Sequence, residues 1–307
     1  MNNNVDLKKI GTEQRNPNTM NIDKVSTNEI LKLINNEDKT VPYAVEKEIE
    51  RIGALVDCIV EQFHKNGRLI YVGAGTSGRI GLIDAVECRP TYSCSDEMVQ
   101  CLMAGGMKAM VKAVEGAEDS KEMAVEQLKE INLNENDVVV GIAASGRTPY
   151  AIGAVEYAKS IGCKTGSIST SANSEIGKVV DFPIEAVTGA EPITGSTRMK
   201  SGTAQKLICN MISTASMVKM GKVYGNLMID VQPTNQKLVK RAQSILSQAV
   251  GVSNEEAQEY IDKYKSVKKS LFAILSGIEE IEKIDEVLER NYGNIRDALR
   301  EVGVEND

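Results

Sequence analysis

The sequence predicts an α/β fold of three layers, with helices on both faces of a five-stranded parallel sheet. Five short apolar runs are separated by stretches with helical spacing, and the runs do not alternate between apolar and polar residues. Strands of this kind are buried on both faces, which is typical of a parallel sheet between helices. The runs are Leu69–Val72, Met98–Met103, Val138–Ile142, Thr165–Ile168 and Phe182–Ile184. We expect the flavodoxin-like strand order 2-1-3-4-5, in which the first and third strands are neighbours.

The chain before the first run predicts an arm and two helices. Residues 1–20 are polar and rich in asparagine, which predicts a disordered N-terminal arm. The arm contains the segment TEQRNPNT, whose side chains are distinctive but to which spacing alone assigns no role. A capping box at Ser26–Glu29 begins one helix, and Thr40 begins another that runs past Phe63 and ends at Gly67. Residues 21–240 are predicted to form one domain.

After the fifth run, the chain carries a segment rich in Gly, Ser and Thr, VTGAEPITGSTRMKSGTAQK, at residues 187–206. Its length and its cations predict a loop that faces a substrate, with Ser196 and Lys200 as candidate ligands. A long helix is expected from there to Gly221, and residues 222–240 lack clear periodicity. Short amphipathic helices, one of them capped at Ser253–Glu256, predict a small helical domain over residues 241–307 for packing or dimer support.

Composition and charge exclude several classes of protein. A net charge of −7 argues against nonspecific binding to nucleic acid, which needs a basic surface. No apolar run approaches the roughly 20 residues that span a membrane, and the N-terminus has no apolar signal core. Six cysteines without a CxxC pair fit a reduced, cytoplasmic protein. Because His64 is the only histidine, acid–base chemistry is expected to fall to carboxylates rather than to a catalytic triad or a His-rich metal site.

Two glycine-serine turns repeat the same design. RLIYVGAGTSGR ends at Arg79 and DVVVGIAASGR ends at Arg147, so their Ser-Gly-Arg endings are offset by 68 residues. In such turns glycine lets the backbone approach an anion, the hydroxyl donates a hydrogen bond, and the following helix offers free N–H groups. The turns follow the first and third runs, whose carboxyl ends should meet where the strand order reverses. We therefore predict one phosphate site between the first loop, Gly73–Gly78, and the second loop, Ala143–Thr148.

The first loop also matches the dinucleotide pattern GxGxxG. A dinucleotide site needs an acidic residue at the end of the second strand, but that strand ends at Met103-Ala104-Gly105-Gly106. The pattern also leaves the second loop unexplained, so a sugar phosphate is favoured over NAD. Among the carboxylates, Glu87 stands among apolar and cysteine residues, and Glu118 stands in a turn on the strand-end side. These features alone do not identify a reaction.

Three groups of segments carry a resemblance to a known family. They are LIYVGAGTSGRIGLIDAVECRPTY, AVEGAEDS with DVVVGIAASGRTPY, and ITGSTRMKSGTAQK with KVYGNLMIDV. From about residue 12 to about residue 240, the chain resembles the N-acetylmuramic acid 6-phosphate etherases of the sugar isomerase (SIS) fold group. The resemblance implies cleavage of a D-lactyl ether from a sugar phosphate during recycling of cell-wall amino sugars, without a metal or redox cofactor. It also implies that the C-terminal helical domain is UBA-like.

The resemblance places the family's two catalytic glutamates on Glu87 and Glu118. Glu87 would protonate the departing lactate and later activate water, and Glu118 would assist ring opening or transfer of the C2 proton. The phosphate grip of the SIS group falls on both loops, with the hydroxyls of serine and threonine and the backbone amides of Thr76 and Gly146. The residues concerned are Gly75, Thr76, Ser77, Gly78, Ser145, Gly146 and Thr148.

The spacing of Ser77 and Glu87 raises a geometric question. Ten residues of straight helix rise by roughly 15 Å, which separates a phosphate at Ser77 from chemistry at Glu87. Either the helix is short and bent before Pro90, or Glu87 reaches the site of a neighbouring subunit. Since SIS proteins commonly dimerise, we expect a homodimer with the active site near or across the interface. The alternatives are a sugar-phosphate isomerase and a non-catalytic sensor, as in the related glucokinase regulatory protein.

Overall fold

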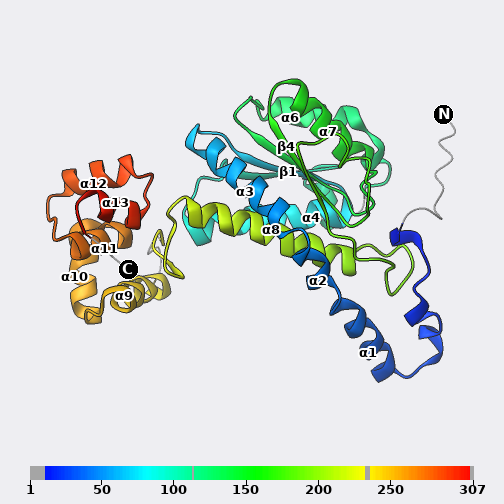
Figure 1. Ribbon diagram of the computed structural model, residues 1–307, viewed down its shortest axis with the longest axis horizontal. Helices are drawn as coiled ribbons and strands as arrows, with labels where there is room; N and C mark the ends of the chain where they lie inside the picture. The colour runs from blue at the N-terminus through cyan, green and yellow to red at the C-terminus, as the bar shows by residue number, and fades with distance from the viewer. Residues whose placement is uncertain (1–10, 113, 232–235, 305–307) are drawn as a thin grey trace. The chain divides into compact units, whose positions relative to one another are not determined.

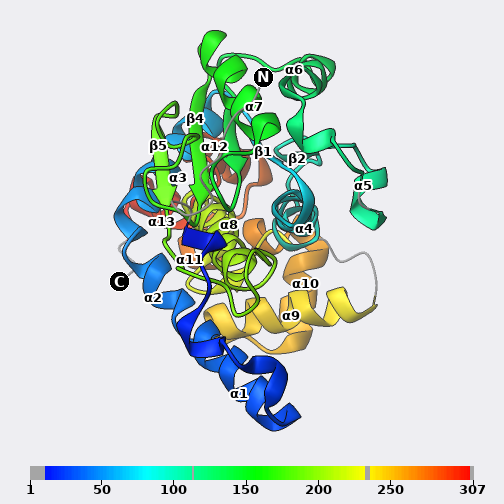
Figure 2. The same cartoon turned by 90° about the vertical axis from the view of Figure 1, so that its right-hand side faces the viewer.

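A five-stranded parallel sheet forms the centre of the larger part of the chain (Figure 1). The computed structural model describes residues 11–112, 114–231 and 236–304. The strands are β1 (Leu69–Gly73), β2 (Val99–Met103), β3 (Val138–Ile142), β4 (Lys164–Ser169) and β5 (Phe182–Glu185). Their order is β2-β1-β3-β4-β5, with β2 and β5 at opposite edges (Figure 2). The predicted runs and the predicted strand order are therefore confirmed.

Helices cover both faces of the sheet, as predicted. One face carries α6 (Lys121–Glu130) and α7 (Pro149–Ser160), and the other carries α3 (Ile49–His64), α4 (Gly75–Tyr92) and α8 (Lys200–Lys219) (Figure 1). Ile70 and Val72 of β1 belong to the apolar core on the side of α6 and α7. Tyr71, between them, points to the opposite side, where its hydroxyl contacts the Asp84 carboxylate of α4 at 3.1 Å. Because both faces are covered, β1 and β3 are buried along their whole length, which explains their unbroken apolar sequence.

The N-terminal segment corrects one prediction. From residue 11 to the start of α1, the structure has three short 3₁₀ helices: η2 (Gly11–Glu13), η3 (Pro17–Thr19) and η4 (Ile22–Lys24). The amide of Asn16 donates to the Ala190 carbonyl at 3.1 Å, and the hydroxyl of Thr19 donates to the Pro192 carbonyl at 2.8 Å. The prediction of a disordered arm is therefore wrong for residues 11–20, while residues 1–10 lie outside the described chain. The ordering comes from hydrogen bonds to a distant loop, which no local pattern encodes.

The next helices begin where the sequence predicts but divide differently. Helix α1 (Thr27–Asp38) carries the predicted capping box, with the Ser26 amide donating to the Glu29 carboxylate at 3.0 Å. The single helix predicted from Thr40 is instead α2 (Val41–Glu46) followed by α3. The break falls at Glu48, whose buried carboxylate accepts a hydrogen bond from the Glu185 amide of β5 at 3.2 Å. The helix that the local apolar spacing predicts as continuous is therefore divided at a residue that makes a long-range contact.

The chain divides into two units by its internal contacts. The first runs to Val86 and resumes at Asp96–Ser213, and the second takes Glu87–Ser95 and the chain from Thr214 onward. This division falls within α4 and α8, whereas the sequence places a domain boundary at residue 240; the predicted domain limits stay a prediction. None of the helices in the described ranges is both long and apolar enough to cross a membrane.

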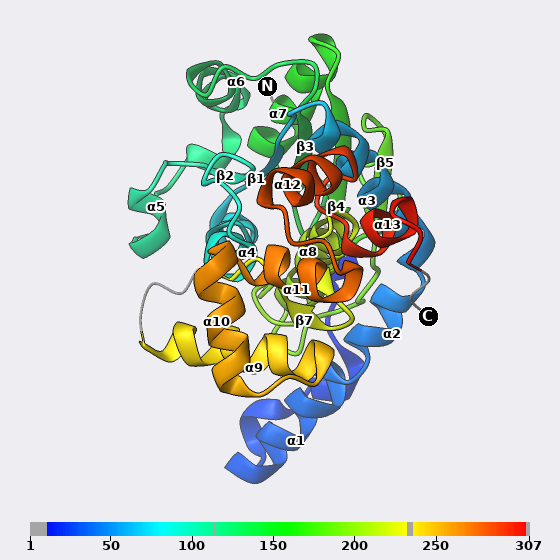
Figure 3. The same ribbon diagram turned by 90° about the vertical axis from the view of Figure 1, so that its left-hand side faces the viewer.

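The second unit is mainly helical (Figure 3). It holds the antiparallel pair β6 (Val223–Tyr224) and β7 (Leu227–Met228), then α9 (Gln236–Val250), α10 (Asn254–Tyr264), α11 (Val267–Ser276), α12 (Ile281–Arg290) and α13 (Ile295–Glu301). The predicted capping box at the start of α10 is confirmed, since the Ser253 amide donates to the Glu256 carboxylate at 2.9 Å. Leu246, Leu271 and Phe272 lie at the centre of this unit's own apolar core.

Candidate functional site

The two glycine-serine loops lie side by side at the carboxyl ends of β1 and β3. These strands pair in parallel, with Gly73 opposite Ile142, so both loops begin at the same level of the sheet. Residues 75–78 of the predicted first loop form the first turn of α4, and the second loop leads into α7. Two helix N-termini therefore start from neighbouring strands at the point where the strand order reverses. This is the arrangement in which α/β proteins bind anionic ligands.

Both loops contain glycines that no other residue could replace without strain. Gly75 and Gly146 have φ angles of +55° and +68°, in the left-handed region that favours glycine. A Cβ atom added to Gly146 would lie 2.3 Å from the Cβ of Ser174, and one added to Gly78 would lie 2.6 Å from the Gly73 carbonyl oxygen. Because the backbone packs too tightly for a side chain at Gly78 and Gly146, the turns present backbone N–H groups at these positions.

The loop hydroxyls differ in what they contact. Ser77 is buried, and its Oγ donates to Oε1 of Gln205 at 3.0 Å. Ser145 is half-buried and accepts a hydrogen bond from the Arg147 amide at 3.3 Å. Thr148 is the residue before α7, but its hydroxyl does not cap that helix. Ser145 and Thr148 therefore stand partly open at the second loop, whereas Ser77 is held by a neighbouring helix.

The first two turns of α8 connect the two loops. An added Cβ on Gly202 would lie 3.4 Å from the Thr76 side chain, and Gln205 reaches Ser77 one turn later. On the other side, the hydroxyls of Thr170 and Ser201 are 2.9 Å apart, and Thr170 also donates to the Ala144 carbonyl at 3.0 Å. Sequence reasoning missed Gln205 and Ser201, because it read residues 187–206 as one loop. The helix begins at Lys200, and Ser201 and Gln205 in its first turns are buried on the side of the loops.

Lys200 directs its charge into the protein. Its ammonium is buried, lies 2.7 Å from Oε2 of Glu37, and also donates to the Ala190 carbonyl at 3.1 Å. Burial favours the neutral form of Glu37, but hydrogen bonds from Lys200 and Asn18 outweigh it and lower the pKa of that carboxylate. Contact between Lys200 and a substrate stays a prediction, and the ammonium is committed to Glu37 in this structure. Ser196 is half-buried in a turn, where its amide donates to the Ile193 carbonyl at 3.0 Å.

A second buried carboxylate caps α8. Glu191 is fully buried and accepts hydrogen bonds from the backbone amides of Lys200 at 2.8 Å and Ser201 at 2.9 Å. The Ser201 hydroxyl donates to the same carboxylate at 2.7 Å. A negative charge at a helix N-terminus is stabilised by the unpaired amides and the helix dipole. Glu191, the single carboxylate of residues 187–206, therefore acts as a structural cap.

Glu118 lies beside the first loop. It belongs to η5 (Ala117–Asp119) and is exposed, and it lines a cavity of about 80 Å³ together with Gly75 and Arg79. Arg79 anchors the far wall, because its guanidinium donates to the Ala109 carbonyl of α5 (Lys108–Val111) at 2.7 Å. The structure thus brings one predicted glutamate to the loop that is predicted to hold phosphate.

Glu87 is exposed on α4 and does not line that cavity among the residues described. Helix α4 continues through Pro90 to Tyr92, so the helix is not short, and the ten-residue step from Ser77 to Glu87 corresponds to a rise of about 15 Å. Ile83 and Val86, on the same face of the helix, are 55% and 60% exposed. Glu87 therefore lies next to two apolar side chains that are exposed on the surface of this single chain.

Comparison with known proteins decides the family. Residues 51–159 match the family model described as the N-terminal SIS domain of glucokinase regulatory protein, and residues 225–281 match the model of its C-terminal lid domain. An N-acetylmuramic acid 6-phosphate etherase of Bacillus cereus is 54% identical over 294 residues, covering 95% of this chain and 100% of that one. One from Clostridium beijerinckii is 52% identical over 299 residues, covering 97% and 98%. The chain belongs to the N-acetylmuramic acid 6-phosphate etherase family.

The match to the SIS-domain model covers both loops and both glutamates, whereas the first turns of α8 lie between the two matched models. A solved phosphoheptose isomerase of Neisseria gonorrhoeae is 13% identical, with a TM-score of 0.47, covering 62% of this chain and 98% of that one. Within the described ranges, His, Cys, Asp and Glu form no group of three or more that could hold a metal ion.

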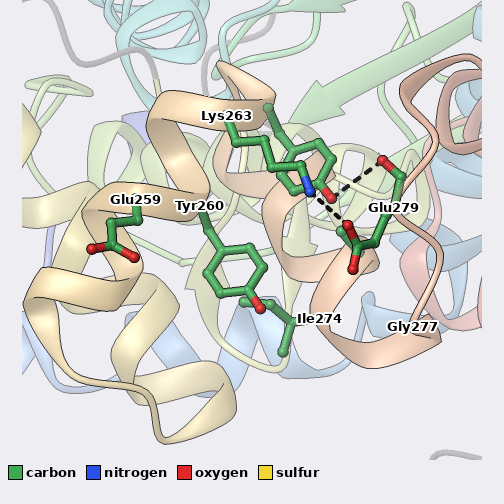
Figure 4. Close-up of a pocket in the computed structure, with 8 residues that line it drawn as sticks. Glu259, Tyr260, Lys263, Ile274, Gly277 and Glu279 are labelled. Carbon is green, nitrogen blue, oxygen red and sulfur yellow. Dashed lines mark hydrogen bonds and ion pairs between the residues drawn. The ribbon is translucent and has the colours of Figure 1, made fainter.

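This etherase-family chain also has a larger hollow in the region that matches the lid domain (Figure 4). The hollow has a volume of about 310 Å³ and lies between α10 and α11. Its charged groups pair with each other, since Nζ of Lys263 lies 2.9 Å from Oε2 of Glu279. The Tyr264 hydroxyl likewise donates to the Glu279 carbonyl at 3.4 Å. None of the residues predicted to act on a substrate lines it, so the candidate site is placed at the two loops.

Proposed function

We propose that this protein cleaves the D-lactyl ether of N-acetylmuramic acid 6-phosphate, releasing D-lactate and N-acetylglucosamine 6-phosphate. The observation that carries the proposal is identity of 52–54% to etherases over nearly the whole chain. The paired loops at the ends of β1 and β3 support it, because they provide a phosphate site. We place the reaction in the cytoplasm, in recycling of cell-wall amino sugars. The six cysteines, which are free thiols, suit a reducing compartment.

The phosphate of the substrate is held by both loops in this proposal. The hydroxyls of Ser77, Ser145 and Thr148 donate to its oxygens, together with the backbone amides of Thr76 and Gly146. Gly75 and Gly78 allow the phosphate to approach the backbone. Gly75 has a positive φ angle that favours glycine, and the close packing at Gly78 leaves no room for a side chain. The N-terminus of α4 adds a positive dipole end beneath the anion. Holding the phosphate fixes the sugar relative to the carboxylates.

The reaction is an elimination followed by addition of water. Opening of the sugar ring creates an aldehyde at C1, which makes the C2 proton acidic. A base removes this proton, a double bond forms between C2 and C3, and the C3–oxygen bond to lactate breaks. Water then adds its oxygen to C3 and a proton returns to C2. Each step needs proton transfer by a positioned group, and carboxylates can supply it.

We assign the proton transfers to the two glutamates. Glu118, which lines the cavity beside Gly75 and Arg79, assists ring opening or moves the C2 proton. Glu87 protonates the departing lactate oxygen and then removes a proton from the attacking water. Ser196 contacts the substrate from the loop between β5 and α8. Lys200 serves the site by holding that loop through its ion pair with Glu37.

The proposal is tested by incubating the purified protein with N-acetylmuramic acid 6-phosphate and measuring D-lactate enzymatically. We expect D-lactate and N-acetylglucosamine 6-phosphate in equal amounts. An isomerised sugar phosphate without lactate would establish the alternative isomerase function, whose chemistry shares ring opening and C2 proton transfer. Binding without any conversion would instead establish a non-catalytic sensor. If the protein were a nicotinamide enzyme, it would bind NAD, and a fluorescence titration would detect this binding. We expect no NAD binding.

We further propose a homodimer whose active site is shared. A proton-transfer group works best when it is shielded from bulk water, yet Glu87 is exposed and has the exposed Ile83 and Val86 on its helix face. A second copy of the chain would cover this face and bring Glu87 to the loops of its partner. The helical rise of about 15 Å between Ser77 and Glu87 supports the same assignment.

Mixed dimers test the shared site. A dimer of a Glu87→Ala chain with a Ser77→Ala chain is expected to recover lactate release, because one of its two sites combines an intact Ser77 with an intact Glu87. The matched control pairs a wild-type chain with a chain that carries both substitutions. In this control each shared site has one defect, so it should be inactive. The reverse pattern, an inactive first hybrid and an active control, would place both residues in one chain's site.

A further inference from the structure

The side-chain amide of Gln205, next to Ser77, has a hydrogen-bond partner for its oxygen but none for its nitrogen among the described residues. It lies in the second turn of α8 and is fully buried. Its Oε1 accepts the proton of the Ser77 hydroxyl at 3.0 Å, while its Nε2 is buried without a hydrogen-bond partner among the described residues. A buried amide nitrogen without a partner is costly, so this arrangement calls for an explanation.

The direction of this hydrogen bond conflicts with phosphate binding. A serine hydroxyl has one proton, and here that proton points to Gln205. The oxygens of a phosphate dianion only accept hydrogen bonds, so Ser77 can bind phosphate only if its proton turns outward. A half-turn of the Gln205 amide exchanges its oxygen and nitrogen, which have nearly the same shape. Nε2 would then donate to Ser77 Oγ, and the buried nitrogen would gain its missing partner.

We infer that Gln205 is a positioning residue, which donates from its amide nitrogen to Ser77 and thereby aims the Ser77 hydroxyl at the substrate phosphate. The inference rests on the proposed function, in which Ser77 binds that phosphate. It also provides a reason for an amide, and not a carboxylate or an apolar side chain, at a buried position that faces an anion. Gln205 can accept a hydrogen bond when the site is empty and donate one when the site is filled.

The surroundings of Gln205 fix its place relative to Ser77. One turn before it, Ser201 bonds to Thr170, which in turn bonds to the second loop. Beyond it, the Asp84 carboxylate of α4 accepts from Asn210 of α8 at 2.6 Å and from Ser213 at 3.0 Å. Helix α8 is thus tied to the second loop on one side of the Ser77–Gln205 contact and to α4 on the other.

Two substitutions of similar size separate the chemistry of the amide from its shape. In Gln205→Glu, the ionised carboxylate only accepts, so it retains the Ser77 proton and repels the phosphate. We expect KM for the sugar phosphate to rise by about tenfold to a hundredfold, the range for loss of a hydrogen bond to a charged group, with kcat changed far less. In Gln205→Met, Ser77 can donate but is no longer aimed, so we expect a smaller rise of about threefold to tenfold.

The pH dependence of Gln205→Glu provides a readout that a structural role would not give. A protonated carboxyl group carries an O–H donor and can replace the amide nitrogen beside Ser77. The ratio of the variant's KM to the wild-type KM, measured at each pH, should therefore fall toward one as pH is lowered and the new glutamate becomes protonated. Gln205→Met should show a constant ratio. In a Ser77→Ala background, Gln205→Met should have no further effect on KM.

Calorimetric binding of N-acetylglucosamine 6-phosphate keeps the two proposals separable. If the wild-type protein binds this product but releases no lactate, the proposed function fails, and the Gln205 variants still test the positioning role through their affinities. Thermal unfolding serves as the folding control for both variants, because Gln205→Met removes an unpaired nitrogen but also the acceptor of the Ser77 hydroxyl. Folded variants that bind the product as tightly as wild type would overturn the inference.

Discussion

Replacement of Glu87 by glutamine is expected to lower kcat for D-lactate release by about a hundredfold to ten-thousandfold, the usual contribution of a positioned acid–base group. The affinity for N-acetylglucosamine 6-phosphate should stay within roughly threefold of wild type, since Glu87 is assigned to the proton transfers at the lactyl ether and not to the phosphate. Glutamine keeps the size and polarity of the side chain but cannot protonate the departing oxygen of lactate. The loss should therefore appear in the chemical step and not in binding.

The measurement is an enzymatic assay of D-lactate under saturating substrate, with Glu115→Gln as the matched control. Glu115 is an exposed carboxylate in the same turn as Glu118, and it does not line the cavity beside Gly75. Its replacement should leave kcat unchanged. Lactate release by Glu87→Gln at the wild-type rate would remove Glu87 from the mechanism, whatever its position on α4.

Exchange of the C2 proton with deuterated water then separates the roles of the two glutamates. Ring opening and removal of the C2 proton precede the departure of lactate in the proposed sequence. Glu87→Gln should therefore still exchange the C2 proton of N-acetylglucosamine 6-phosphate, while Glu118→Gln should lose this exchange. Loss of exchange in Glu87→Gln with retention in Glu118→Gln would reverse the assignment.

Local patterns in the sequence were sufficient to predict the sheet and the position of its loops. Each strand is an apolar run bounded by helical spacing, and the handedness and order of parallel strands follow general rules. The offset of the two Ser-Gly-Arg turns then placed the loops at neighbouring strands. These features depend on residues close together in the chain, which is why a single sequence reveals them.

The features that escaped prediction depend on polar side chains that meet across long stretches of sequence. Asn16 and Thr19 order the N-terminal segment through the carbonyls of Ala190 and Pro192. Glu48, at the break between α2 and α3, accepts a hydrogen bond from the amide of Glu185. Gln205 contacts Ser77 because α8 packs against α4. A buried hydrogen bond of this kind has no periodicity, so neither partner signals the other in the sequence.

Replacement of Lys200 by methionine is expected to lower the free energy of unfolding by about 3–5 kcal/mol at neutral pH, the range found when one partner of a buried ion pair is removed. Lys200 and Glu37 are both buried and lie 2.7 Å apart. Without Lys200, the Glu37 carboxylate would be left as an unpaired charge beside Asn18. Chemical denaturation of the two proteins measures the difference.

The dependence of this difference on pH has a definite sign. In the wild-type protein the pKa of Glu37 is lowered, because hydrogen bonds from Lys200 and Asn18 outweigh its burial. Glu37 therefore adds stability above its unfolded pKa of about 4.3, and this stability is lost as pH falls through the lower folded value. In Lys200→Met, burial dominates and raises the pKa of Glu37. The gap in stability between the two proteins should thus shrink as acid protonates Glu37.

A double-mutant cycle distinguishes a buried charge from simple loss of packing. If Lys200→Met destabilises the protein by stranding Glu37, then addition of Glu37→Gln should restore part of the lost stability, since a neutral amide can still accept from Asn18. The control is the exposed pair Lys178–Glu175, with a similar separation of 2.8 Å, where Lys178→Met should change stability by about 1 kcal/mol or less. Equal effects of the two lysine substitutions would show that Lys200 does not balance a buried charge. The larger effect at Lys200 would instead explain how the cation at the start of α8 holds α1 and the loop after β5 in one arrangement.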